Sequence, residues 1–341
     1  MHSTRDEPRG PVAAHELCFV CCIESGILES LTLRLVESIR SFGGGFSKSP
    51  IVAVTPRRGP RLSRATVGRL RELDVEYVRM PLVSRYAWFN FLNKPAALAH
   101  VEEQADAASI AFVDSDVLVL GEPIALALPD GVDVIAAVPD IAVGATTGPG
   151  DEMDDAWRAL CELCSVKLDD LPWVTTRLDR QQIRLCFQAG VFAYRRELGL
   201  GTAYRDAVIS TMDGGIRLPG TAWTFLEQAL LAPLVVGRGL RWRQLPFDHN
   251  LTMASYLTQY FRAEELRDAR LVHYHDSMAP HFWPTFLERL AVDHASVGSW
   301  LEPLGPAVDE APWDARMVRT AMRAQRGLRR RAHHVRADRV Q

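Results

Sequence analysis

The chain has 341 residues, of which 48% are hydrophobic, and a formal net charge of −3. This composition is typical of a globular protein with one large or two ordinary domains, and it argues against a disordered or strongly basic nucleic-acid-binding chain. Residues 1–11 are polar, and no apolar run approaches the roughly 20 residues that span a bilayer. We therefore expect a cytoplasmic protein.

Six cysteines in a chain of this length do not form a disulfide framework. Cys18, Cys21 and Cys22 lie in an apolar, strand-like run, where buried thiols are common. Cys161 and Cys164 have the spacing of metal ligands, but no second pair of cysteines or histidines accompanies them at zinc-finger distance. We expect these thiols to belong to the core rather than to a zinc site.

Strand and helix patterns alternate over the first eighty residues. They predict a strand at 16–23, a helix at 27–42, a strand at 51–55, a helix capped by Ser63 and a strand at 75–79. This order is typical of a parallel sheet with helices on both faces and a ligand crevice at the carboxyl ends of the strands, where Glu24 falls. The chain has neither a G-x-G-x-x-G motif nor a Walker A sequence, which argues against dinucleotide-dependent enzymes and P-loop NTPases.

Asn93, Lys94 and Pro95 open the next predicted helix, since proline suits the first helical position. A lysine at a helix N-terminus can join the backbone amides in holding a phosphate. An isolated exposed lysine is more commonly a solvated charge. The helix leads directly into an acidic strand pattern, which favours the phosphate-binding interpretation.

In the run from 110 to 120, apolar residues occupy both odd and even positions around Asp114 and Asp116, as in a strand buried on both faces. In one continuous strand the two carboxylates leave the same face, and a divalent cation such as Mg²⁺ or Mn²⁺ relieves their repulsion. Alternatively, the strand ends at Asp114, both acids are solvated in a turn, and a new strand starts at Val117. These residues alone favour neither alternative.

The second half begins with a Gly-, Thr- and Pro-rich loop at 141–155, suited to cover a site. It continues with a predicted helix at 154–166, an irregular stretch at 173–184 and a strand at 186–195, in which Gly190 either admits a substrate or marks a bulge. A helix predicted at 223–231 carries Glu227 and Gln228 in its middle turn. On a bare helix such a pair is commonly exposed to solvent, whereas beside a sugar it can orient a hydroxyl.

His273 and His275 alternate with apolar residues, so both are expected on one face of a strand. A lone histidine in a strand is commonly a hydrogen-bonded core residue. Neutral imidazole is also a common metal ligand, and a set of two carboxylates and one histidine suits Mn²⁺. With Asp114 and Asp116 nearby in the pattern, we favour His273 over His275 as the ligand.

The end of the chain is basic, with nine arginines and one acid from Arg316 to Arg339. We expect residues 305–341 to form a basic tail or helix outside the active site. Such a segment can contact an anionic lipid surface at the membrane periphery, a nucleic acid or an acidic partner. It can equally be a solvated terminal helix.

Seven segments resemble, in the same order, motifs of the nucleotide-diphospho-sugar glycosyltransferases of the GT-A fold, and among these the retaining, glycogenin-like group called family 8. The match spans roughly residues 16–283. The segments are Asn93-Lys94-Pro95, the D-x-D run at 112–120, Ala-Ala-Val-Pro-Asp at 136–140, the F-N-x-G-V-like strand at 187–195, Glu227-Gln228, 245–250 and 271–275.

The resemblance implies an α/β, Rossmann-like GT-A domain over residues 12–304, with a mainly parallel central sheet, helices on both faces and a D-x-D metal site. It implies Mn²⁺ or Mg²⁺ bound by Asp114, Asp116 and His273, and a role in the chemical step for Gln228 and Glu227. The donor would be bound by Glu24, Lys94, Asp114, Ser115, Asp116, Gln188, Ala189, Gly190 and His275.

The activity implied is metal-dependent transfer of a sugar from a nucleotide diphosphate, with UDP favoured, to an acceptor hydroxyl with retention; no nucleic-acid partner is expected. The family has asparagine where Gln188 stands and aspartate where Glu227 stands. After the histidine it has a K-P-W lysine that this chain lacks at that spacing, and His281 either takes its place or does not. These departures keep open a non-catalytic sugar-nucleotide or carbohydrate-binding relative. A haloacid-dehalogenase-like phosphatase also has a D-x-D motif, but Val117 and Leu118 argue against it.

Overall fold

The computed structural model describes residues 10, 12–80, 85–255 and 263–337, and its centre is a seven-stranded sheet. The strand order is β10-β6-β9-β4-β1-β2-β3. Only β9 among these strands runs antiparallel to its neighbours. The predicted mainly parallel α/β sheet is therefore confirmed. The strands are β1 (Leu17–Cys22), β2 (Ile51–Thr55), β3 (Glu76–Arg79), β4 (Ser109–Val113), β6 (Val134–Ala137), β9 (Gln188–Arg195) and β10 (Trp242–Gln244).

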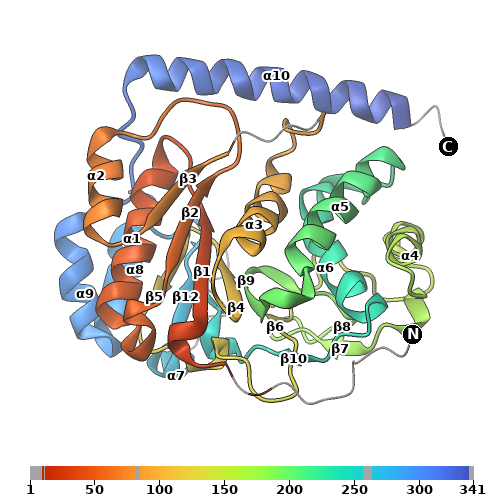
Figure 1. Cartoon of the computed structure of the whole chain (residues 1–341), viewed down its shortest axis with the longest axis horizontal. Helices are drawn as coiled ribbons and strands as arrows, with labels where there is room; N and C mark the ends of the chain where they lie inside the picture. The colour runs from red at the N-terminus through yellow and green to blue at the C-terminus, as the bar shows by residue number, and fades with distance from the viewer. Residues whose placement is uncertain (1–9, 11, 81–84, 256–262, 338–341) are drawn as a thin grey trace.

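Helices cover both faces of this sheet (Figure 1). Neighbouring residues of β1 show the two layers, because Val20 belongs to one buried cluster and Phe19 to the other. A strand buried on both faces has no polar alternation, which is why these strands read as apolar runs. On the first face lie α3 (Asn93–Gln104), α4 (Asp154–Leu163), α5 (Leu200–Asp213) and α6 (Leu226–Gly237); on the second lie α1 (Ile27–Phe42) and α2 (Arg64–Glu72).

Local signals explain where the first helices begin and which face they bury. The apolar stripe of α1 is buried at Leu31, Leu35 and Ile39, as its helical spacing predicts. Ser63 caps α2 as expected, since its hydroxyl accepts a hydrogen bond of 3.0 Å from the Thr66 amide. These helices thereby fix the loops that follow β1 and β2 at the carboxyl-end edge of the sheet.

The acidic run at 110–120 is broken into two strands, so of its two alternatives the turn at Asp114 with a new strand from Val117 is the one observed. β4 ends at Val113, the Val117 amide donates to the Asp114 carbonyl at 3.1 Å in a turn, and β5 (Val117–Val119) then begins. β5 leaves the central sheet and pairs antiparallel with β12 (Leu271–His273), which also pairs with β11 (Leu251–Thr252). The chain breaks here because two different sheets use its two halves.

Two other segments differ from expectation. The stretch at 173–184 contains a hairpin of β7 (Trp173–Thr175) and β8 (Gln182–Arg184), two strands shorter than an apolar pattern can reveal. Helix α6 begins at Leu226, so Glu227 and Gln228 lie in its first turn rather than its middle turn. The predicted helix ended at Leu231, but the buried helix continues through Pro233 to Gly237.

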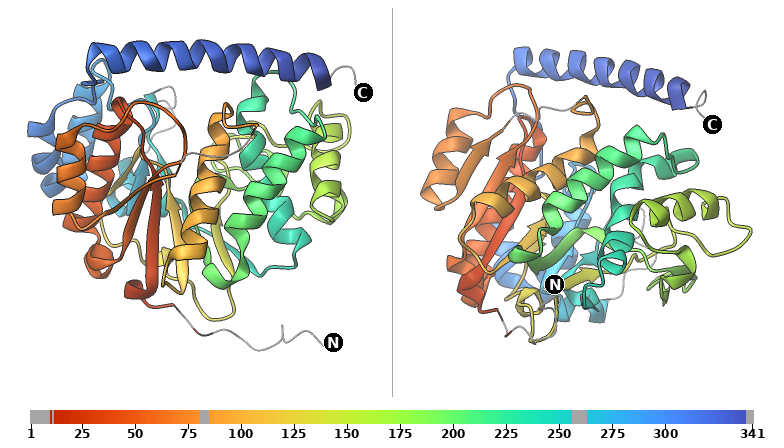
Figure 2. Two further views of the ribbon diagram at one scale, coloured as in Figure 1. Left: turned by 45° about the horizontal axis from the view of Figure 1, so that its top comes forward. Right: turned by 45° about the vertical axis from the view of Figure 1, so that its right-hand side comes forward.

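The C-terminal part adds α7 (Ala263–Asp268), α8 (Trp283–Asp293), α9 (Ala295–Leu301) and the long helix α10 (Trp313–Ala337). Figures 1 and 2 show α10 lying across the carboxyl-end edge of the sheet, from the side of α2 and α9 toward α5. Within the described ranges, no helix has both the length and the apolar character needed to cross a membrane. Arg339, the end of the predicted basic segment, lies outside the described residues.

Candidate functional site

A cleft of about 520 Å³ opens at the carboxyl-end edge of the central sheet. Its walls come from the residues that directly follow successive strands, as the topology of an open α/β sheet dictates. Glu24 follows β1, Arg57 follows β2, Asp114 and Asp116 follow β4, and Asp140 follows β6; all five line the cleft.

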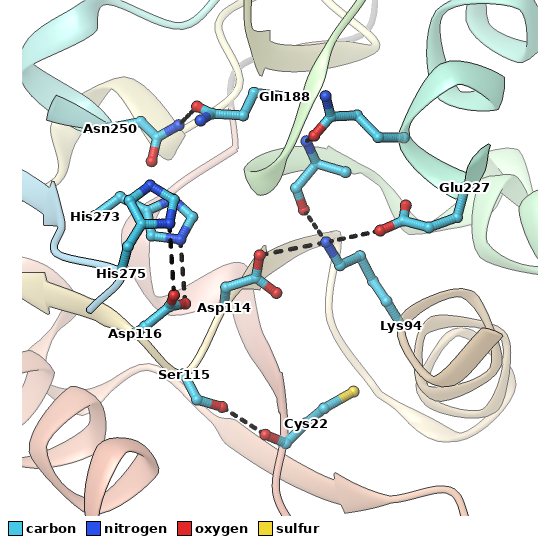
Figure 3. A network of polar contacts seen from close by, with 12 residues as sticks. Cys22, Lys94, Asp114, Ser115, Asp116, Gln188, Glu227, Asn250, His273 and His275 are labelled. Atoms are coloured by element: carbon cyan, nitrogen blue, oxygen red, sulfur yellow. Dashed lines mark hydrogen bonds and ion pairs between the residues drawn. The ribbon is translucent and has the colours of Figure 1, made fainter. Parts of the chain in front are cut away.

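One side of the cleft gathers Asp116, His273 and His275 (Figure 3). The antiparallel register of Val117 with His273 brings these elements together. Asp116 Oδ1 lies 3.1 Å from His273 Nε2, and Asp116 Oδ2 lies 3.8 Å from His275 Nδ1. His275 follows the end of β12 with a left-handed φ of 51°, and its ring stacks on that of His273 at 3.9 Å. A strained backbone thus places a second imidazole beside the same carboxylate.

Mutual charges dominate the electrostatics of these three residues. Burial opposes ionisation of Asp116, but the adjacent His273 outweighs it and lowers the aspartate pKa to about 2. Burial likewise opposes protonation of His273, yet Asp116 raises the pKa of that imidazole. Burial and the neighbouring His273 lower the pKa of His275 to about 3. His275 therefore presents a neutral imidazole, the form that binds metal ions.

Gly190 in β9 makes room for this arrangement. A Cβ atom added at this position would lie 2.5 Å from His273 Cε1 and 3.2 Å from Asp114 Oδ2. The ladder between β6 and β9 is also irregular beside it, between Ala136 and Ala137. The glycine therefore accompanies a bulge, which is one of the two interpretations given above. His273 and Asp114 occupy the space that a side chain would need.

Lys94 joins the opposite side of the cleft, and its side chain is only 10% exposed. Its Nζ lies 3.3 Å from Asp114 Oδ2 and 3.4 Å from Glu227 Oε1, and donates to the Ala189 carbonyl at 2.7 Å. Burial raises the pKa of Asp114 to about 6 against the opposing effect of Lys94, whose own pKa these carboxylates raise despite burial. The interpretation of Lys94 as an exposed solvated charge is wrong.

Glu227 and Gln228 are both held from behind the cleft. The Tyr204 hydroxyl donates to the Glu227 carboxylate, and also to the Glu227 carbonyl at 2.9 Å. The Ala189 amide donates to Gln228 Oε1 at 3.4 Å. Because α6 starts just before them, both side chains project from its first turn into the cleft lining.

The remaining predicted residues divide between the cleft and the wall behind it. Gln188 lines the cleft and accepts a hydrogen bond from the Asn250 amide. Ser115 and Ala189 are absent from the lining. Ser115 is buried and donates to the Cys22 carbonyl at 2.6 Å, which ties the acidic turn to β1. Donor contact by Ser115 and Ala189 stays a prediction.

Sequence reasoning missed Arg57, which forms a two-armed ion pair with Glu24 at the cleft wall. Asn90 accepts from Arg57 Nη1 at 2.9 Å, and Asn93 donates to Glu24 at 2.8 Å. The available signal was positional, because Arg57 follows the strand at 51–55 by two residues and so falls at the carboxyl-end edge.

A parallel-sheet cleft lined by an acid-histidine cluster at the strand ends is where α/β enzymes commonly bind their substrates. Residues 19–239, more than half of the chain, match the Rhodobacterales glycosyltransferase domain. The protein belongs to this family and is a glycosyltransferase. The hypothesis of a phosphatase is therefore wrong.

Among solved structures, the chain is similar to the WbbM bifunctional glycosyltransferase in its apo form, with 12% identity and a TM-score of 0.44. The similarity covers 85% of this chain and 51% of that one, so this chain spans about half the length of WbbM. None of the curated proteins matches the chain.

Proposed function

We propose that this glycosyltransferase transfers a sugar from a nucleoside diphosphate, with UDP favoured, to an acceptor hydroxyl with retention of anomeric configuration, and that it depends on a divalent metal. The observation that carries the proposal is the convergence of Asp116, His273 and His275 on one wall of the cleft, facing the Lys94–Asp114 pair. Residues 12–304 would form the catalytic domain.

The donor set fits a divalent cation. Ligand atoms of the three residues lie within 4.8 Å of one another, and combine one carboxylate with two imidazoles. Oxygen ligands alone suit Mg²⁺, whereas imidazole favours a transition metal, so Mn²⁺ is the better match. Asp116, His273 and His275 would hold the ion, with Asp114 beside them. When bound, the ion supplies a Lewis acid for the charge on a departing diphosphate.

Lys94 is a positioning residue in this proposal. Its ammonium group contacts Asp114 and Glu227 at once, so it holds both carboxylates in place and offsets one of their two negative charges. Tyr204 holds Glu227 from the other side. Glu227 is therefore suited to keep the first turn of α6 in place, while Gln228 is the residue of the pair suited to face the transferred sugar.

The nucleoside end of the donor is expected near β1 and β2. Glu24 is already paired with Arg57, so this pair presents a fixed polar edge rather than a free charge. Gln188 and Gly190 of β9 line the cleft on the other side of β4 from this edge, beside the acid-histidine cluster. Together, these residues would bind the donor along the cleft.

A thermal-shift panel of UDP-, GDP- and dTDP-sugars, each with Mn²⁺ or with chelator, tests the proposal. A donor at 100 times its dissociation constant stabilises the fold by about 2.7 kcal/mol, so the correct nucleotide should raise the melting temperature only with Mn²⁺. The matched control is Asp116→Asn, which keeps the shape of the side chain and removes its charge. No shift with any donor, or an equal shift in chelator, would contradict the proposal.

A further inference from the structure

Positive charge is concentrated on helix α10, and the rest of the protein is acidic. Between Trp313 and Ala337 it carries eight arginines and one aspartate, a net charge of +7 with histidine neutral. The whole chain has a net charge of −3, so the remainder has a charge of −10. A local charge of +7 on an acidic body creates a positive potential on the α10 side, which attracts that side to an anionic surface.

The outward face of α10 is apolar. Trp313, Met317, Leu328 and Val335 are 74%, 61%, 65% and 52% exposed. Their spacings of 4, 11 and 7 residues keep them on one stripe of a helix with 3.6 residues per turn. Exposed large apolar side chains in such a row mark an interaction surface rather than a solvated face.

The opposite face of α10 holds the helix against the body of the protein. Arg319 pairs with Asp309 and lies 3.4 Å from the Ser25 hydroxyl, and Arg326 donates to Asn90 at 3.0 Å. The His333 ring contacts Trp88 at 5.7 Å between centroids. These contacts fix which stripe points outward, so its exposure is a property of the docked helix.

We propose that α10 docks the protein onto an anionic lipid surface, with the apolar stripe in the headgroup region and the flanking arginines on the phosphates. Arg316 and Arg323 flank the stripe and are exposed. This arrangement is that of an interfacial amphipathic helix. Arg331 lies on the same stripe, but most of the stripe is formed by Trp313, Met317, Leu328 and Val335, whereas a nucleic acid would need arginines along its whole length.

The position of the helix gives the docking a consequence for the site. α10 crosses the carboxyl-end edge of the sheet (Figure 2), and Arg326 contacts Asn90, which lines the cleft. None of the described residues that line the cleft belongs to α10. Docking therefore brings the cleft edge to the lipid surface without using a donor-binding residue. The inference does not depend on the identity of the donor.

Co-sedimentation of the full-length protein with vesicles tests this inference. The vesicles contain phosphatidylcholine alone or phosphatidylcholine with phosphatidylglycerol, at low and high salt. We expect binding only to the phosphatidylglycerol vesicles and its loss at high salt, because arginine-phosphate attraction is screened within a Debye length. Met317→Gln with Leu328→Gln should weaken binding at least about tenfold, since each substitution removes an apolar side chain from the interface.

Ile124→Gln with Val292→Gln is the matched control, because these two apolar residues are 60% and 76% exposed but lie outside α10. The control pair should bind like the unmodified protein. Failure to bind phosphatidylglycerol vesicles at low salt would overturn the inference. So would equal binding by the α10 pair, or retention of a DNA duplex in place of vesicles in the same assay.

Discussion

Gly190→Ala should weaken metal binding while the protein still folds. The new Cβ atom would lie 2.5 Å from His273 Cε1 and 2.9 Å from His273 Nδ1. Carbon atoms pack at about 3.5–4.0 Å, so the imidazole must retreat by about 1 Å. Metal sites tolerate ligand displacements of about 0.2 Å, and even loss of an outer-shell partner weakens metal affinity about 10–100-fold. Loss of the ligand itself should cost at least as much.

The assay is a titration of Mn²⁺ in which electron paramagnetic resonance counts the free ion. The matched control is Gly68→Ala in α2, where a Cβ atom meets nothing within 4 Å. That substitution should leave Mn²⁺ affinity unchanged and stabilise the helix by about 0.5–1 kcal/mol. If Gly190→Ala binds Mn²⁺ as tightly as the unmodified protein, His273 is not a ligand and the steric argument fails.

Three further substitutions or deletions test other parts of the account. Gln228→Ala should lower turnover and leave nucleotide affinity nearly unchanged; collapse of affinity at constant turnover would contradict its placement at the sugar. Tyr204→Phe removes a hydroxyl from the buried Glu227 carboxylate and should lower the free energy of unfolding by about 1–3 kcal/mol in urea, whereas no change would show that the bond is dispensable. Truncation after Pro312 removes α10 and should retain donor hydrolysis while abolishing vesicle binding; lost hydrolysis in a folded truncation would place α10 in the active site.

The first half of the fold could be predicted closely because its signals are local. The helix at 27–42 and the strand at 51–55 have the predicted bounds, since one has a regular apolar stripe and the other a short, fully buried run. The break at Asp114 could not be read from the run that contains it. Its cause is the pairing of β5 with β12, more than 150 residues away in the sequence, and apolar content alone does not reveal a change of sheet.

The sequence indicated which residues lie at the cleft better than it indicated which of them contact one another. Asp116 and His273 lie together as expected, whereas Asp114 pairs with Lys94. His275 also lies beside Asp116, but as a left-handed residue beyond the end of β12 rather than as part of the strand. Arg57 was missed because a lone arginine in a turn carries no motif. The outward stripe of α10 needed the structure, since only packing shows which face the body covers.

Calorimetric titration of UDP with and without Mn²⁺ tests the central claim most directly. If the ion bridges the diphosphate to the cluster, metal and donor must raise each other's affinity by the same factor. We predict weak UDP binding in chelator, tight binding with Mn²⁺, and loss of that difference in Asp116→Ala and His273→Ala. Equal UDP affinity with and without Mn²⁺ in the unmodified protein would contradict the metal bridge, and with it the assignment of Asp116, His273 and His275 as its ligands.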